Sequence, residues 1–260
     1  MEQAAAIPLS MLADRWIAYY WPFVDPQVPI LQGPTSQRDG QLRQDMSFRS
    51  ELTRLYAAWE QFIGSSAQPS DGSLLVADLR VERLRKQYPA SMLDAYARAQ
   101  RAIVIALQMP IRYAGSRGQE WTAFPHPALA RSLGPQVVQV PGTRPDDRCL
   151  LVEATLWAMF RDVSLWVEAL CVHEWSLFTE RVTEGSAQSR DRGAAYRLLT
   201  AHPESRRPLT WERNHVEVLL LEGESFTCPW TDQRIVQETP FDIDHLLPLA
   251  VYPMNDLWNL

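Results

Sequence analysis

Hydrophobic residues recur at three- and four-residue steps along much of the chain, which is the spacing of one face of an α-helix. The pattern predicts helices at residues 11–22, 47–63, 74–86, 90–108, 150–184, 190–201 and 211–221. The segment 150–184 carries the longest helical signal, with a candidate break at 161–164. Thr210 is expected to cap the start of the last helix, and Gly223 its end.

Turn-forming residues separate these helices and dominate two longer segments. Residues 25–46 are rich in Pro, Gln, Gly and Asp and predict a loop, and residues 111–147 predict irregular structure with one small strand pair near 137–140. After residue 225 the pattern predicts a strand, a turn and a returning strand, followed by a further strand at 241–244. The predicted fold is therefore mainly α, with a helical domain at 1–222 and a small module at 223–260.

Composition narrows the class of protein. No run approaches 18 apolar residues, so no membrane span is expected, and the N-terminus lacks the pattern of a secretory signal. The three cysteines, Cys149, Cys171 and Cys228, are widely spaced, which argues against a structural zinc site and a disulfide framework. A cytoplasmic location is the default expectation.

The net charge of −6 argues against tight, non-specific DNA binding by the whole surface, although it leaves room for a local positive face. A basic set on the predicted helix 74–86 is either a solvated face or a DNA track: Arg80, Arg83, Arg85 and Lys86. A second basic set lies just before the C-terminal module and is better placed to contact a phosphate backbone: Arg206, Arg207 and Arg213.

The last twenty residues, 241–260, bring chemistry-bearing side chains together. Asp244 and His245 are adjacent, Pro248 follows, and Asn259 comes fourteen residues after His245. A histidine whose ordinary pKa is about 6.5 can take a proton from water, and a carboxylate can hold a hard cation. Adjacent strand residues point to opposite faces, so the pair needs a bend to share one site, and Pro248 is consistent with such a bend.

This pattern resembles the front half of the HNH nuclease motif, the ββα-metal site. The resemblance implies that Asp244 is a metal ligand, that His245 is the general base, and that Asn259 fixes the loop that orients the histidine. It also implies DNA as substrate and a divalent cofactor, with Mg²⁺ expected first and Mn²⁺ or Ni²⁺ as alternatives. Thr231 stands where many HNH proteins carry a second cysteine after Cys228, so the chain resembles the variants without structural zinc.

The third residue of the HNH motif would lie beyond Leu260, on a following helix, so the module 223–260 is expected to be incomplete. We accordingly expect the 260-residue chain to be a shortened form that binds divalent metal weakly and cleaves DNA little.

More loosely, residues 16–22 and 257–260 resemble a set of bacterial HNH proteins that pair a helical N-terminal region with a C-terminal nuclease. The expected function is a metal-dependent DNA endonuclease, with bacterial defence suggested by family analogy alone. The alternative is a non-catalytic interaction or DNA-binding protein that retains an HNH remnant and docks a partner through its helical domain. The stripe of Trp157, Trp166 and Trp175 is expected to be core or partner surface.

Overall fold

A computed structural model describes most of the chain: residues 3–27, 29–32, 37–38, 41–42, 45–115, 119–184, 189–201 and 209–244. The chain divides into two compact units, Met1–Ala201 and His202–Leu260, and each is described by itself. This division precedes the predicted domain boundary after residue 222, because the helix at 210–221 contacts the segments that follow it.

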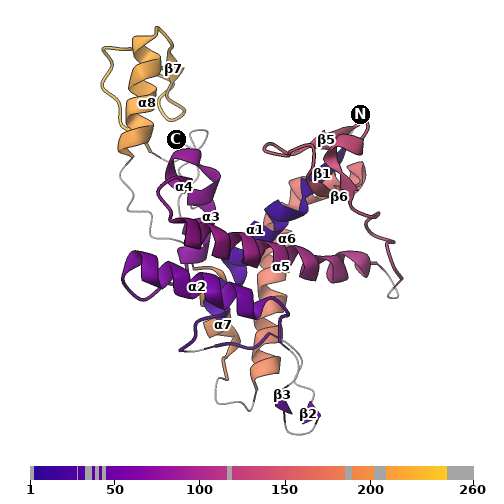
Figure 1. The fold of residues 1–260 in the computed structure, drawn as a ribbon. Coiled ribbons are helices and arrows are strands. Elements are labelled where there is room, and N and C mark those ends of the chain that lie inside the picture. The colour runs from indigo at the N-terminus through magenta and orange to yellow at the C-terminus, as the bar shows by residue number, and fades with distance from the viewer. Residues whose placement is uncertain are drawn as a thin grey trace. The chain divides into compact units, whose positions relative to one another are not determined.

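The first unit is mainly helical, as the hydrophobic spacing predicts (Figure 1). Its helices are α1 (Leu9–Tyr20), α2 (Arg49–Ile63), α3 (Asp71–Arg80), α4 (Glu82–Arg85), α5 (Ala90–Arg112), α6 (Ala154–Thr183) and α7 (Arg192–Leu199), with 3-10 turns at Trp21–Phe23 and Ala130–Ser132. Helix α6 has a non-helical residue, Val163, so the predicted break at 161–164 is confirmed.

Two predicted helices differ from those in the structure. The single helix expected at 74–86 is divided, because Val81 adopts an extended conformation (φ −93°, ψ 113°) between α3 and α4. Helix α5 continues past its predicted end to Arg112 with Pro110 inside it. A proline inside a helix removes one backbone hydrogen bond. Here α5 gains more from packing, since its buried face extends from Met92 to Ile111.

A small mixed sheet lies at the N-terminal end of α1 (Figure 1). Its order is β4-β6-β1-β5, formed by Ala128–Leu129, Arg148–Val152, Ala4–Pro8 and Val137–Gln139. Strand β1 pairs parallel with β5 and antiparallel with β6, with Ala6 opposite Leu151. The strand near 137–140 is confirmed, whereas the helix predicted from residue 150 is wrong over 150–152. A short apolar run is compatible with both a strand and a buried helix, so hydrophobic periodicity does not distinguish the two at 150–152.

The segment predicted as a loop at 25–46 contains two short strands of two residues each, β2 (Gln37–Arg38) and β3 (Gln41–Leu42), which pair antiparallel.

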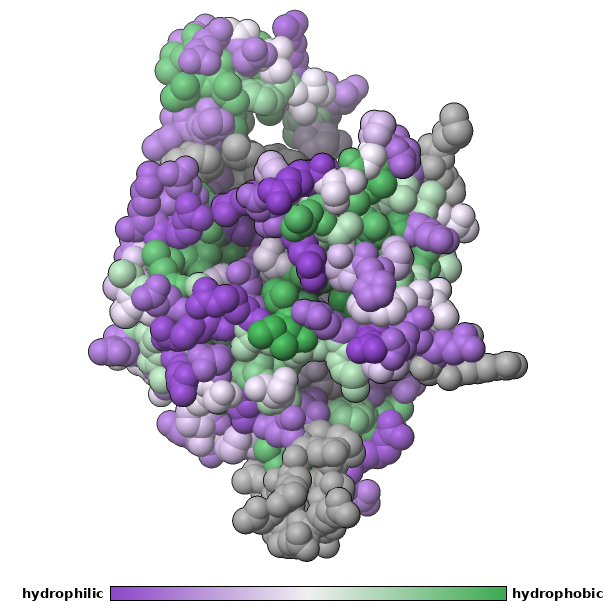
Figure 2. Space-filling model, turned by 45° about the vertical axis from the view of Figure 1, so that its right-hand side comes forward, coloured by the Kyte–Doolittle hydropathy of each residue, from purple (hydrophilic) through white to green (hydrophobic). Residues whose placement is uncertain are grey.

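The core of the first unit is built from the facing sides of α1, α2, α3 and α5. Trp21 is fully buried, its ring lies 5.0 Å from that of Tyr56, and its Nε1 donates to the Gln68 carbonyl. A second cluster joins α6 and α7 to the segment after α1, where Trp175 stacks on Phe23 with ring centroids 5.6 Å apart. On the face that Figure 2 presents, hydrophobic residues lie in separate groups among hydrophilic ones.

The described part of the second unit contains α8 (Thr210–Leu221), β7 (Phe226–Thr227) and β8 (Arg234–Ile235). Thr210 is the first residue of α8, with Leu209 in the capping position, so the predicted Thr210 cap is wrong. Gly223 is confirmed as the helix end: it adopts φ 90°, and the Glu224 amide donates to the Leu219 carbonyl.

No helix in the described ranges is long and apolar enough to cross a membrane.

Candidate functional site

The second unit carries the predicted strand, turn and returning strand. Strands β7 and β8 pair antiparallel, with Phe226 opposite Ile235. The turn between them is closed by two backbone hydrogen bonds, from the Cys228 amide to the Gln233 carbonyl and from the Asp232 amide to the Cys228 carbonyl, both 2.9 Å. Asp232 adopts a left-handed φ of 57°, which an aspartate tolerates better than most residues.

Cys228 sits at the start of this turn. Its thiol pKa is lowered by a hydrogen bond from the Thr231 side chain and by backbone amides of Trp230 and Thr231. Thr231, three residues after Cys228, is the position at which the HNH resemblance would place a second cysteine. Within the described ranges, no three His, Cys, Asp or Glu residues stand together as a metal-binding group.

Arg213 ties α8 to the segment that leads into the predicted metal ligand. Its guanidinium donates to the Phe241 carbonyl at 2.8 Å and to Glu217 Oε1 at 3.3 Å. It also lies 3.5 Å from Asp242 Oδ1 and 5.2 Å from the Phe241 ring centroid. These contacts fix the backbone at Phe241, three residues before Asp244.

The predicted site residues divide between described and undescribed parts of the chain. Asp244 is described and exposed, and Arg213 is described with its side chain 45% exposed. His245, Asn259, Arg206 and Arg207 lie outside the described residues. The strand predicted at 241–244 is wrong: this segment has no regular secondary structure, and its hydrogen bond at Phe241 comes from the Arg213 side chain instead of a neighbouring strand.

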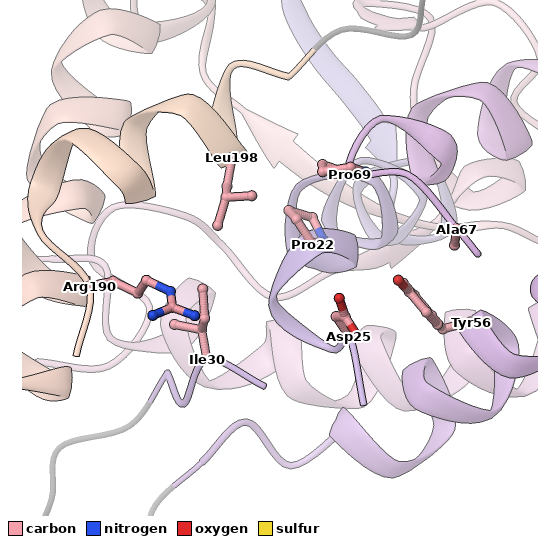
Figure 3. A pocket seen from close by; sticks show the side chains of 8 residues that line it. All are labelled: Pro22, Asp25, Ile30, Tyr56, Ala67, Pro69, Arg190 and Leu198. Atoms are coloured by element: carbon pink, nitrogen blue, oxygen red, sulfur yellow. The ribbon is translucent and has the colours of Figure 1, made fainter. Parts of the chain in front are cut away.

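The first unit has a small cavity of about 150 Å³ between the segment after α1 and α7, drawn in Figure 3. Asp25 and Tyr56 lie on one side of it and Arg190 on the other (Figure 3). Burial, together with the nearby Asp25 carboxylate, raises the pKa of Tyr56 to about 12. A space of this size suits a few waters better than a metabolite, since small-molecule sites are usually about 300–1,000 Å³.

A larger cleft, of about 680 Å³, is lined by residues from α1, α3, α4, α5 and the loop before β6. Asp14 of α1 lines it, and its Oδ1 accepts hydrogen bonds from the Tyr96 hydroxyl and from Gln100 Nε2, both 2.6 Å. Burial raises the pKa of Asp14 above its ordinary 3.8, although both hydrogen bonds and the charges of Arg80 and Arg15 oppose the shift. Sequence reasoning missed this group; a carboxylate inside the apolar spacing of helix 11–22 was the available signal.

Asp14→Asn is expected to stabilise the fold at pH 7, because the amide oxygen can still accept from Tyr96 and Gln100 without the cost of burying a charge. Because the pKa of Asp14 is raised in the folded state, ionisation of this carboxyl lowers the stability of the fold at a pH above that pKa. Below pH 3.8 the carboxyl is mostly protonated in both the folded and the unfolded state, and this loss of stability is absent. The gain should therefore vanish as the pH falls below 3.8. Urea unfolding across this pH range would measure it, and a variant less stable at pH 7 would contradict the prediction.

Comparison with known proteins adds one family. A family model described as a domain of unknown function (DUF8808) matches residues 1–199, which is nearly the whole first unit. No curated protein and no solved structure matches the chain.

Proposed function

We propose a function for this chain, which belongs to the DUF8808 family through residues 1–199. The proposed function is that of a metal-dependent DNA endonuclease of the HNH type. The proposed catalytic module follows the family domain. The observation that supports it best is the β7–β8 hairpin followed by a segment that Arg213 holds just before Asp244. That order, a tight hairpin and then a backbone held at Phe241 three residues before Asp244, suits a site that must present side chains in a fixed position.

Each proposed site residue has a distinct role. The Asp244 carboxylate offers a hard oxygen, which suits Mg²⁺, and His245 would accept the proton of the attacking water. Asn259 would act as a positioning residue that holds the loop of His245. A bound cation would neutralise the charge that develops on the scissile phosphate. The remaining cation ligands in this proposal are substrate oxygens and groups outside the described residues.

The basic residues around α8 are proposed to contact the DNA backbone: Arg206, Arg207 and Arg213. Arg213 would do so while it holds Phe241, since the guanidinium has five N–H donors and its side chain is 45% exposed. An arginine that bridges a protein carbonyl and a phosphate would couple DNA binding to the position of Asp244.

Asp244→Ala is expected to abolish Mg²⁺-dependent cleavage of supercoiled plasmid by the natural full-length protein, because the cation loses its protein carboxylate. Excess Mn²⁺ should restore part of the cleavage, which a folding defect would not allow. Glu238→Ala is the matched control, since Glu238 is an exposed carboxylate of the same unit without a described contact. Undiminished cleavage by Asp244→Ala would contradict the ligand assignment. A wild-type protein that cuts in none of Mg²⁺, Mn²⁺ and Ni²⁺ would contradict the nuclease function itself.

The second candidate function is a non-catalytic interaction or DNA-binding protein whose helical domain contacts a protein partner. The observation that favours it is an exposed apolar set on α6: Leu165, Trp166 and Leu170. Trp175 is partly buried against the second cluster and Trp157 against the main core, but Trp166 is 79% exposed. Exposed apolar groups of this kind often mark protein contacts. A full-length protein that binds supercoiled DNA without cutting it in any of the three metals would favour this candidate.

A further inference from the structure

The cleft beside Asp14 combines features that recur in sites for small charged molecules. Its volume of about 680 Å³ falls inside the usual range for such sites. Its lining comes from segments far apart in the sequence, from Pro8 to Asp147, all within the unit that matches the family model. The cleft thus belongs to the family domain, and none of the proposed nuclease residues lines it.

Three arginines line this cleft: Arg80, Arg85 and Arg144. All three side chains are exposed, and no carboxylate in the described ranges forms an ion pair with any of them. The neighbouring Lys86, by contrast, pairs with Glu82 at 2.8 Å. The same lining holds two aspartates, Asp14 and Asp147, and the charge of Arg80 acts on Asp14. Three arginines against two aspartates leave a local excess of positive charge in a chain of net charge −6.

The backbone that carries these arginines is held by local hydrogen bonds. Val81 breaks the helix between Arg80 and Arg85, and its carbonyl accepts from the Arg85 amide at 2.9 Å. In the loop before β6, the Arg144 amide donates to Asp147 Oδ2 at 2.7 Å, and the Asp147 amide donates back to the Arg144 carbonyl at 3.0 Å. Binding would therefore order side chains but not the backbone, which lowers its entropic cost.

Asp14 and several apolar side chains line the cleft beside the arginines. Both described hydrogen bonds to Asp14 end on Oδ1, so Oδ2 accepts none from the described residues and can accept one from a ligand. Met11, Leu79 and Leu93 add apolar surface to the same cleft. A fitting ligand therefore has an anionic end, an uncharged body and a hydroxyl or amino donor.

The anionic end is better matched by a phosphate than by a single carboxylate. Each arginine offers a planar fork of N–H donors, and three forks exceed what two carboxylate oxygens can accept in good geometry. A phosphate ester or diphosphate carries more oxygens and about two negative charges, which suits arginine clusters.

We propose that this cleft is a binding site for a small organic phosphate of nucleotide size. Arg80, Arg85 and Arg144 hold the phosphate, Met11 and Leu93 contact the uncharged body, and Asp14 accepts a hydrogen bond from it. The proposal does not depend on the nuclease activity, because it concerns other residues and needs no metal.

Calorimetric titration of the full-length protein in EDTA tests the site, with ADP, UDP and pyrophosphate as probes and adenosine and uridine as uncharged comparisons. The two nucleoside diphosphates are expected to bind, and the uncharged nucleosides at least about tenfold more weakly, since each charged hydrogen bond contributes about that factor. Arg80→Gln and Arg144→Gln should each weaken diphosphate binding by about tenfold or more. Arg101→Gln is the matched control, because Arg101 is an exposed arginine of α5 outside the cleft.

Thermal unfolding of each variant separates loss of binding from loss of folding, and Arg80 and Arg144 are exposed enough for their variants to fold. Absence of binding by all probes, or equal binding by the arginine variants and the wild type, would overturn the proposal. Weakened binding of duplex DNA by Arg80→Gln, without any nucleotide binding, would also overturn it in favour of a DNA track on α3 and α4.

Discussion

His245→Ala is expected to lower the rate of plasmid cleavage by the full-length protein about 10²–10⁴-fold, the usual contribution of a general base. The attacking water would lose its proton acceptor, whereas metal binding through Asp244 would remain. Added Mn²⁺ should therefore leave the His245 variant inactive, although it should partly restore Asp244→Ala. This difference between the two variants separates the base from the metal ligand.

His173→Ala is the matched control for this experiment. His173 is exposed on α6, outside the proposed site, so its loss should change neither cleavage nor stability by a measurable amount. Equal far-ultraviolet circular dichroism of the two variants would show that both fold. Full activity in the His245 variant, or an equal loss in the His173 variant, would be incompatible with His245 as the base.

Hydrophobic spacing predicted the helices well where a helix buries one continuous face. Helix α2 was predicted to within two residues, because Leu52, Leu55, Tyr56 and Trp59 point into one core. The break in α6 was visible as a polar interruption near Arg161, and the structure has its non-helical residue at Val163. In these helices local pattern and tertiary packing agree, so periodicity alone is sufficient.

Apart from the confirmed strand near 137–140, the strands of the first unit's mixed sheet were not predicted from the sequence. Strand β1 is a short run, Ala4–Pro8, whose neighbours are β5 and β6, more than a hundred residues later in the chain. A five-residue apolar run carries no period that separates strand from helix. At 241–244 a strand was predicted where none forms. The alternating pattern of this segment suggested a strand, but the segment has no regular secondary structure, and the Phe241 carbonyl accepts a hydrogen bond from the Arg213 side chain.

The two candidate sites differ in how much the sequence shows. Asp244 and His245 are adjacent in the chain, so a short motif is enough to single them out. The organic-phosphate cleft is assembled by tertiary folding from α1, α3, α4, α5 and the loop before β6, and no spacing in the sequence connects Asp14 with Arg144. Of that cleft, only Arg80 and Arg85 stood out in the sequence, as members of a basic set whose role was open.

Gly72 of α3 is a further residue whose role depends on tertiary contacts that the sequence does not show. Helix propensity alone predicts that this glycine destabilises α3. Glycine in a helix is ordinarily about 1 kcal/mol less favourable than alanine. Here a Cβ on residue 72 would lie 2.5 Å from Cβ and 2.7 Å from Cγ of Trp21. Trp21 cannot retreat easily, because it is fully buried and its Nε1 donates to the Gln68 carbonyl at 3.2 Å.

Gly72→Ala is therefore expected to destabilise the first unit by about 1–3 kcal/mol, the usual cost of overpacking a core, despite the better helix propensity of alanine. Urea denaturation followed by tryptophan fluorescence would measure the change. Ser73→Ala is the matched control in the same turn of α3. Ser73 is partly buried and already has a Cβ, so the change adds no atom and should alter stability by no more than about 0.5 kcal/mol. A stabilised Gly72→Ala protein would mean that α3 can shift away from Trp21, and that propensity outweighs packing at this contact.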